Sequence, residues 1–309
     1  MTAPGDGEVV VRRFRPDDRP SLDALVAEGK ANHGFAGSSD PDGGAFGFFA
    51  GLAPEQLAVA VRGATVVGVI SPEIKAVYIT PSERRRGLGR RLAEEAERIE
   101  RERDRPLLFL GTLPADADAL AFLRATGFDY HSTLWDLQLP PQASVPAAIW
   151  PDRLVTRALR LPDDIPAFVD VFNTAFAEHA TPLQMDPSML AEAETEQFAG
   201  DDVHVVEDAD VAGRLIGFCS TDPGRRPGDE PRSEIFTIGV RPELRGHGLG
   251  RELLRWGVDY LRGIRAMPVT LSVNGRNEGA LRLYEREGFV RTGTRDRWAR
   301  PVAAADPAT

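Results

Sequence analysis

The sequence contains two related copies of one segment, and this repeat limits what the chain can fold into. Eight residues recur after a fixed interval of 161 positions. In the first copy they are Glu73, Pro81, Arg84, Gly87, Gly89, Ala119, Gly127 and Phe128, and in the second copy they are Glu234, Pro242, Arg245, Gly248, Gly250, Ala280, Gly288 and Phe289. A constant interval across so many positions predicts two structurally similar domains.

The limits of the two domains follow from a second recurrence and from the prolines between the copies. A Pro-Asp-Asp sequence at residues 16–18 recurs at residues 162–164 and marks the start of a helix in each copy. Prolines cluster at positions 140, 141, 146 and 151, which is typical of a linker. We therefore predict a first domain at 1–140, a linker at 141–151, a second domain at 152–303 and a disordered tail at 304–309.

Both copies show the same order of expected elements. Apolar or alternating segments predict strands at 57–61, 66–70 and 106–110 in the first copy, and at 203–206, 215–220 and 269–273 in the second. Helical segments are expected at 88–101 and 117–125, and again at 249–261 and 278–286. Strands that alternate with helices in this way predict a mixed α/β layer fold.

Composition excludes several classes of function. The net charge of −10 argues against a nucleic-acid partner, which requires a basic surface. No apolar run approaches the roughly 20 residues that cross a bilayer, and residue 1 does not open a signal sequence, so we expect no membrane partner and a cytoplasmic location. Cys219 is the single cysteine, and with five scattered histidines it predicts no metal site.

A glycine-rich turn in the second copy carries the strongest chemical signal. Residues 245–250 read Arg-Gly-His-Gly-Leu-Gly and stand between an expected strand and an expected helix. Backbone amides at such a turn approach an anion closely, and the helix start adds a partial positive charge. The spacing fits neither the dinucleotide-binding fingerprint nor the P-loop. The turn is therefore either a pyrophosphate site or a tight strand-to-helix connection.

Together with a later segment, this turn resembles the GNAT N-acetyltransferase superfamily. Arg245, Gly248 and Gly250 look like its acetyl-CoA pyrophosphate loop, and Asn277 and Tyr284 belong to an Asn-x-x-Ala-x-x-x-Tyr-x-x-x-Gly-Phe segment. The resemblance implies two tandem domains, each a mostly antiparallel mixed sheet flanked by helices, with acetyl-CoA as donor. It also implies a set of cofactor-binding residues, namely Ile238, Gly239, Val240, Arg245, Gly246, His247, Gly248, Leu249, Gly250, Arg251 and Asn277.

Two residues are candidate catalytic groups. Tyr284 matches the acid of the family, and a phenol in reach of the thioester can protonate the departing thiolate. The alternative is that Tyr284 is one more residue on an amphipathic helix. Glu234 opens the strand before the glycine turn, and a carboxylate there can accept the proton of the attacking amine. The alternative is a solvated glutamate at the end of a strand.

The first copy keeps the turn but departs from the catalytic pattern. Asp116 stands 161 positions before Asn277, and Leu123 stands 161 positions before Tyr284. Because leucine cannot donate a proton, we expect an inactive copy with, at most, a weaker cofactor site. That second candidate site comprises Ile79, Arg84, Arg85, Arg86, Gly87, Leu88, Gly89 and Arg90, and the alternative is that its arginines are solvated.

The acceptor is expected to be a primary amine of a small soluble molecule. The tandem arrangement, with its active second half, resembles the mycothiol synthase family, which acetylates a cysteinyl amine. Residues 180–183, Ala-Thr-Pro-Leu, depart from that family's acceptor region. Residues 161–213 hold thirteen acidic and no basic side chains, which would suit a polycationic amine such as an aminoglycoside or polyamine. The motifs are also compatible with a non-catalytic acyl-CoA binding module and with a protein acetyltransferase.

Overall fold

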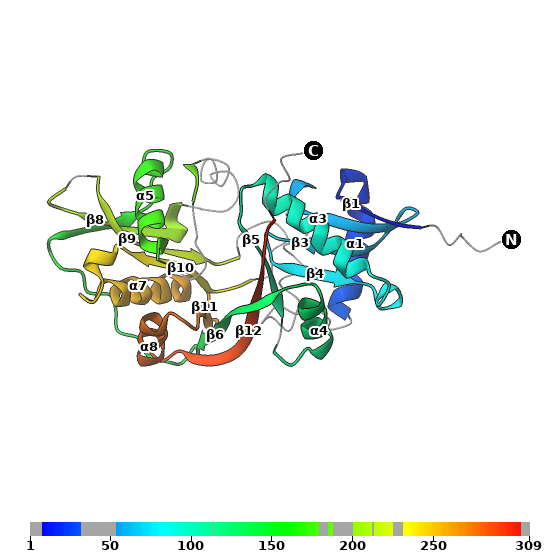
Figure 1. The fold of residues 1–309 in the computed structure, drawn as a ribbon. Coiled ribbons are helices and arrows are strands. Elements are labelled where there is room, and N and C mark those ends of the chain that lie inside the picture. Colours follow the sequence, from blue (N-terminus) through cyan, green and yellow to red (C-terminus); the bar gives the residue numbers. More distant parts are fainter. Residues whose placement is uncertain are drawn as a thin grey trace. The chain divides into compact units, whose positions relative to one another are not determined.

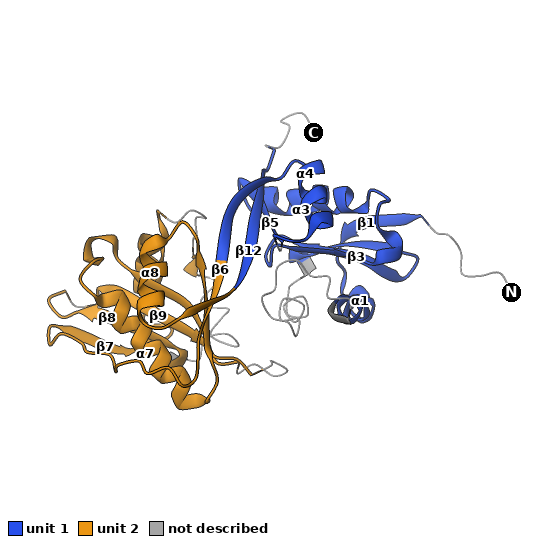
Figure 2. Ribbon diagram, turned by 90° about the horizontal axis from the view of Figure 1, so that it is seen from below, with its two compact units in different colours: residues 1–134, 293–309 blue, residues 135–292 orange. Residues whose placement is uncertain are grey.

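Two units make up the fold in the computed structural model, which describes residues 8–31, 54–112, 114–178, 185–187, 200–211, 213–224 and 231–303. Unit 1 comprises residues 1–134 and 293–309, and unit 2 comprises residues 135–292 (Figure 2). The domain limits predicted above follow the sequence repeat, whereas these units are defined by which residues pack together. The predicted limits therefore stay a prediction.

Unit 1 contains an antiparallel sheet in which neighbouring strands follow one another along the chain (Figure 1). Its strands are β1 (Val9–Arg13), β2 (Ala58–Arg62), β3 (Thr65–Ser71) and β4 (Ala76–Ile79). Side chains alternate between the two faces, so that Val59 and Val61 pack in one core cluster with Leu22 of α1 (Arg19–Ala31). Ala58 and Ala60 pack in another cluster with α3 (Leu88–Glu102). The two helices therefore cover opposite faces.

The rest of unit 1 includes strands from the end of the first copy and a strand from the end of the second copy. β5 (Leu107–Thr112) is followed by α4 (Ala117–Ala125) and by the first part of β6 (Asp129–Leu139). β12 (Val290–Pro301) starts in unit 2, and its last residues pair antiparallel with β5 in unit 1, with Trp298 opposite Leu110. Within unit 1, the last strand of the second copy thus pairs with a strand of the first copy.

Unit 2 repeats this arrangement with longer strands. β7 (Leu154–Ala158), β8 (Val203–Asp208), β9 (Leu215–Asp222) and β10 (Glu234–Val240) are antiparallel, and β11 (Val269–Asn274) is parallel to β10. α5 (Ile165–Phe176) packs on one face, where the rings of Phe168 and Phe218 lie 4.9 Å apart. α7 (Leu249–Ile264) covers the other face, and α8 (Glu278–Arg286) follows β11. Short 3-10 turns lie at Pro16–Asp18, Pro54–Gln56, Pro81–Glu83, Gly200–Asp202 and Pro242–Leu244.

The predicted fold class is confirmed in both units. Each has a mostly antiparallel mixed sheet between helices, and the expected helices at 88–101 and 249–261 correspond to α3 and α7. The longest described helix, α7, has 16 residues, fewer than the roughly 20 that a bilayer crossing requires, and no described helix could span a membrane.

The proline-rich segment expected to be a linker is held against α7 in unit 2. Arg262 donates hydrogen bonds to the carbonyl oxygens of Pro140 and Ala143, at 2.9 and 2.8 Å. The backbone amide of Ile149 donates to Glu252 at 2.8 Å. These contacts tie residues 140–149 to the helix that follows the glycine turn.

Candidate active site in unit 2

The site begins where two parallel strands separate. β10 pairs with β9 along its whole length, but the one described ladder pair between β10 and β11 joins Glu234 to Thr270. Both strands continue beyond this pair, to Val240 and Asn274. The edge of β10 that faces β11 is therefore available to pair with a ligand, since neighbouring strands satisfy these backbone groups elsewhere.

A bulge in β10 accompanies the separation. The register shifts between Ile235 and Thr237, and Ile235 and Ile238 both pack in the core cluster that contains α7. Residues on one face of a regular strand are two apart, so a spacing of three shows that Phe236 is the extra residue. Its side chain is 63% exposed.

The glycine turn follows β10 directly. Gly246 and Gly248 have φ values of 82° and 88°, a region that favours glycine, and Gly248 is the N-cap of α7. No described atom lies within 4 Å of the place where a Cβ would stand on either residue. The turn therefore leaves open space in front of the start of α7, as an anion-binding cradle requires.

Arg245 holds this turn in place. Its guanidinium donates to the carbonyl oxygens of Val240, at 3.3 Å, and Ala175, at 2.7 Å, and pairs with Glu178 at 3.3 Å. In unit 1, Arg84 donates in the same way to the carbonyl oxygen of Ile79, at 2.9 Å. The recurring arginine therefore positions the turn against the end of its strand in both copies.

The turn, the end of β10 and α8 surround a cavity of about 780 Å³. The cavity brings together most of the residues that the sequence singled out for cofactor binding. Those that border it are Ile238, Gly239, Val240, Arg245, Gly246, Gly248, Leu249, Gly250, Arg251 and Asn277. His247 does not border it, and its Nδ1 atom lies 3.0 Å from the carbonyl oxygen of Arg245.

The helix α8 supplies two polar side chains to this cavity. Asn277 is its N-cap, and its Oδ1 atom accepts a hydrogen bond from the backbone amide of Ala280 at 3.1 Å. Tyr284 borders the cavity from the same helix and is half-buried. Burial raises the pKa of the Tyr284 phenol above its ordinary value. Tyr284 therefore stays protonated at neutral pH, as a proton donor must.

Glu234, the candidate base, does not border the cavity. It is half-buried and opposes Asp222 and Thr270 at the point where β10 and β11 are still paired. Ile238, which does border the cavity, lies four positions further along the chain, a distance of roughly 13 Å in a regular strand. Glu234 therefore lies apart from the described residues that line the cavity.

Several cavity residues were missed in the sequence. They are Ala175, Phe176, Glu178, Leu244, Asn274, Arg276, Gly279, Ala280, Arg282, Leu283 and Arg286. These residues border the cavity because α5 and α8 pack near the glycine turn in the folded protein. A sequence motif does not predict such tertiary packing. The one available signal was the series of arginines that follows Asn277 in the sequence.

The corresponding turn of unit 1 is more crowded. Gly87 has a φ of 77°, but Arg85 replaces a glycine at a φ of 63°. The ring of Phe122 lies 2.7 Å from where a Cβ would stand on Gly89, whereas the nearest atoms to the matching point on Gly250 are 3.9 Å away. An aromatic ring therefore lies close over the start of α3 in unit 1, whereas the start of α7 in unit 2 has more room at the matching position.

The other first-copy residues are engaged with the protein itself. Arg85 pairs with Asp118 at 2.7 Å, Arg86 with Glu83 at 3.5 Å, and Arg90 donates to the carbonyl oxygen of Ala125 at 3.3 Å. Leu88, at the start of α3, and Leu123, on α4, are buried in the same core cluster, and Leu123 is 2% exposed.

Glu73 is also held by ion pairs, at 3.3 Å to Arg103 and 3.2 Å to Arg105. The first-copy counterpart of Glu234 is thus fixed by two cations.

Part of the acidic segment at 161–213 is neutralised by ion pairs where it is described. Asp164 and Glu207 both pair with Arg157, at 2.5 and 3.1 Å, and Asp170 pairs with Arg241. Residues 180–183 lie outside the described residues. The ion pairs leave a weaker negative field than the sequence suggested.

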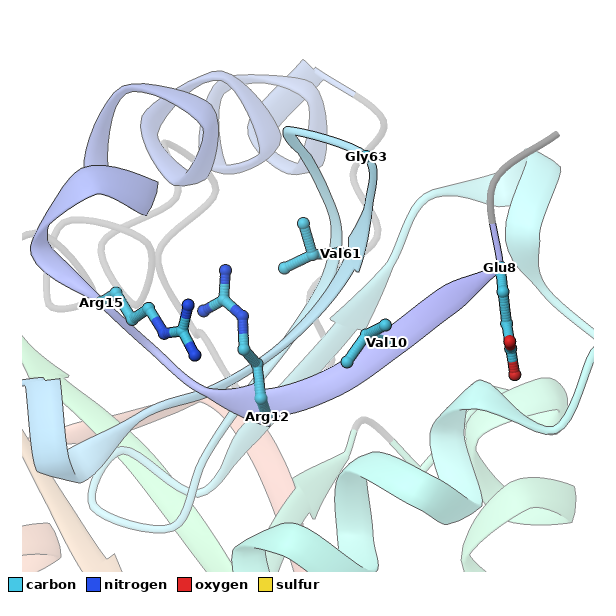
Figure 3. A pocket seen from close by; sticks show the side chains of 6 residues that line it. All are labelled: Glu8, Val10, Arg12, Arg15, Val61 and Gly63. Atoms are coloured by element: carbon cyan, nitrogen blue, oxygen red, sulfur yellow. The ribbon is translucent and has the colours of Figure 1, made fainter. Parts of the chain in front are cut away.

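A second hollow lies beside β1 in unit 1, with a volume of about 500 Å³ (Figure 3). Arg12, Val10 and Val61 line it together with Arg15, which follows β1. Arg12 forms an ion pair with Asp18 at 2.6 Å, so part of its charge is already neutralised. No catalytic side chain borders this hollow, and among the described residues no group of three His, Cys, Asp or Glu could hold a metal ion.

Known proteins resemble this chain over most of its length. A profile described as the acetyltransferase (GNAT) family matches residues 23–128 and 166–289. The mycothiol acetyltransferase of Salinispora tropica is 34% identical over 220 residues, which cover 69% of this chain and 68% of that protein. The mycothiol acetyltransferase of Propionibacterium freudenreichii is 29% identical over 290 residues, which cover 90% of this chain and 87% of that protein.

A solved structure agrees with this similarity at the level of the fold. A tandem GNAT protein from the clavulanic acid biosynthesis pathway superposes with a TM-score of 0.65, covering 97% of this chain and 100% of that chain. The two sequences are 20% identical, so the likeness shows the fold alone.

Proposed function

Because this chain belongs to the acetyltransferase (GNAT) family, we propose that unit 2 transfers an acetyl group from acetyl-CoA directly to a primary amine of a small molecule. The observation that carries this proposal is the cavity where β10 and β11 separate, since it joins the glycine turn, Asn277 and Tyr284. Bound acetyl-CoA supplies an activated thioester. The proposal includes a cytoplasmic location and requires no metal.

The cradle fits a pyrophosphate. The open space over Gly246 and Gly248 would be filled by a Cβ, and the first amides of α7 point toward it with the positive end of the helix dipole. In the proposal, the amides of residues 246–251 bind the pyrophosphate. The unpaired edge of β10 at residues 238–240 binds the pantetheine arm as a neighbouring strand would.

Two residues of unit 2 then move protons. Tyr284 donates the proton that the departing thiolate needs, and burial, which raises the pKa of the phenol, keeps the phenol protonated before the transfer. Glu234 accepts the proton of the ammonium or of the attacking amine through water, because it lies outside the cavity. After each transfer, solvent returns a proton to Tyr284 and removes the proton that Glu234 has accepted, and the protein is ready for another turnover.

The acceptor we favour is the cysteinyl amine that is acetylated in mycothiol synthesis. The relatives at 29 to 34% identity that are named mycothiol acetyltransferases support it. A polycationic amine is favoured less, because the acids at Asp164, Asp170 and Glu207 are already paired with arginines. Unit 1 contributes support to the fold and, at most, a weaker donor site.

Thiol release from acetyl-CoA tests the proposal with a panel of acceptors. The panel contains the cysteinyl glucosaminyl-inositol conjugate, polyamines, aminoglycosides and lysine peptides. We expect the conjugate to accelerate release far more than any other compound. If acetyl-CoA binds but no amine accelerates release, the protein is a non-catalytic acyl-CoA binding module, and the proposal is wrong.

A further inference from the structure

Three arginines from α8 and the residues just before it border the cavity. Arg282 and Arg286 stand one helical turn apart on α8, and Arg276 precedes the N-cap of that helix. All three are exposed, and residues four apart on a helix lie on the same face. They form a basic group, which we call the α8 arginines, at the rim of the cavity.

The charges around the cavity exceed what a pyrophosphate at the turn requires. Among the residues that the structure describes, the charged ones that border it are five arginines and one glutamate, Glu178. Arg245 is committed to Glu178 and to two carbonyl oxygens, and Arg251 pairs with Glu287 at 3.4 Å. Backbone amides and the helix dipole already serve the pyrophosphate. The α8 arginines are therefore placed to attract a further anionic group.

The carboxylate that pairs with Arg282 does little to neutralise it. Arg282 pairs with Glu278 at 3.0 Å, but both side chains are well exposed, at 60% and 74%. An exposed pair of this kind contributes little free energy and breaks readily when a better partner arrives. A phosphate monoester carries about −1.5 to −2 charges near neutral pH and is such a partner.

The repeat shows that the α8 arginines belong to the second copy alone. The residues 161 positions earlier are Ala115, Ala121 and Ala125, although the neighbouring Ala119 and Gly127 are kept. In the first copy, arginines stand instead in the turn, where they pair with Asp118 and Glu83. The two copies thus share the helix and its cap but differ in charge along this rim.

We propose that the α8 arginines bind the terminal phosphate monoester on the nucleoside end of the donor. This inference rests on the proposed function, since it takes coenzyme A as the occupant of the cavity. The glycine turn then holds the pyrophosphate, and the α8 arginines make unit 2 select coenzyme A over dephospho-coenzyme A. Arginine suits this task because its planar donor groups match phosphate oxygens.

Titration calorimetry with these two ligands tests the inference without any turnover. We expect the wild-type protein to bind coenzyme A at least about tenfold more tightly than dephospho-coenzyme A, as charged hydrogen bonds to phosphate imply. In the variant Arg276→Ala/Arg282→Ala/Arg286→Ala, which restores the first-copy residues, the ratio should fall close to one. The affinity for dephospho-coenzyme A should change little.

A matched control removes an exposed arginine of unit 2 that lies outside the cavity. Arg153→Ala should leave the ligand ratio at its wild-type value, because Arg153 does not border the cavity. Equal wild-type affinities for the two ligands, or an undiminished ratio in the triple variant, would overturn the inference while leaving the proposed function intact. Failure of both ligands to bind the wild-type protein would instead overturn the proposed function.

Discussion

Asp116 and Asn277 cap their helices in the same way, although one is charged and the other is neutral. The side-chain oxygen of each accepts a hydrogen bond from the backbone amide three residues later, at 2.9 Å for Asp116 and 3.1 Å for Asn277. The exchange therefore preserves the helix that follows. The two copies keep the same framework but differ at Tyr284, where the first copy has the buried Leu123.

Replacing the phenol tests the proposed acid. Tyr284→Phe removes the proton donor but keeps the ring that packs near Phe289, with ring centroids 6.1 Å apart. We expect kcat to fall by about 10 to 10^4 fold, with acetyl-CoA affinity nearly unchanged. Steady-state kinetics and calorimetry measure the two quantities separately.

Tyr260→Phe is the matched control for that experiment. Tyr260 lies on α7, where its hydroxyl donates to Asp202 at 2.7 Å, and it does not border the cavity. This variant also loses a tyrosine hydroxyl oxygen, but at a position outside the cavity, so turnover should stay close to that of the wild type. Equal turnover in Tyr284→Phe and wild type would remove the acid assignment.

The candidate base has a counterpart in the other copy that serves as its control. Glu234→Gln should lower kcat/KM by about 10 to 10^4 fold and remove the acid limb of the pH profile, because an amide cannot accept the proton. Glu73→Gln should leave the profile unchanged, since Glu73 is held between Arg103 and Arg105. An acid limb that persists in Glu234→Gln would assign the base to another group.

The glycine turns allow a direct comparison of the two copies. Gly248 and Gly87 both have positive φ values, 88° and 77°, and both face open space, so valine imposes similar backbone strain at each. Gly248→Val should abolish turnover because it distorts the cradle in unit 2. Gly87→Val should leave most of the turnover, and circular dichroism should confirm that both variants are folded. Loss of activity in a folded Gly87→Val protein would mean that the first turn is the working one.

The repeat and the periodicity of apolar residues predicted most of the helices and strands, because the spacing of residues along the chain determines where these elements form. The interval of 161 residues identified matching turns, and their φ values and caps are indeed alike at Gly87 and Gly248. The strand exchange by β12 was not predicted, because a strand's own sequence does not specify which sheet edge it pairs with. The docking of residues 140–149 on α7 escaped notice for a similar reason, since it depends on the distant Arg262.

The candidate site was predictable only where a backbone geometry demands a residue type. Glycine at positive φ and a capping asparagine leave such a trace in the sequence. The bulge at Phe236 leaves none, because it appears only when the register with β9 is known. The α8 arginines are also invisible to a motif, since exposed arginines on a helix are common and their position at a cavity follows from tertiary packing.

The last prediction concerns stability and rests on His204 in unit 2. His204 is 9% exposed and stacks on Trp256, with ring centroids 4.3 Å apart. Burial lowers the pKa of the His204 imidazole from 6.5 to about 4. Between these values the unfolded chain binds a proton that the folded protein does not. The free energy of unfolding should therefore be at its full value above pH 6.5. It should decrease by on the order of 3 kcal/mol as the pH drops toward 4.

Urea denaturation at several pH values between 7.5 and 4.5 measures this loss. His204→Phe keeps an aromatic ring in the stack and removes the titrating group, so its unfolding free energy should decline less over the same range. His247→Ala, at an exposed position, should decline as the wild type does. The window stays clear of Asp18, because a hydrogen bond from Arg12 lowers the pKa of that carboxyl below its usual 3.8. Parallel declines in the wild type and in His204→Phe would show that another group governs acid stability.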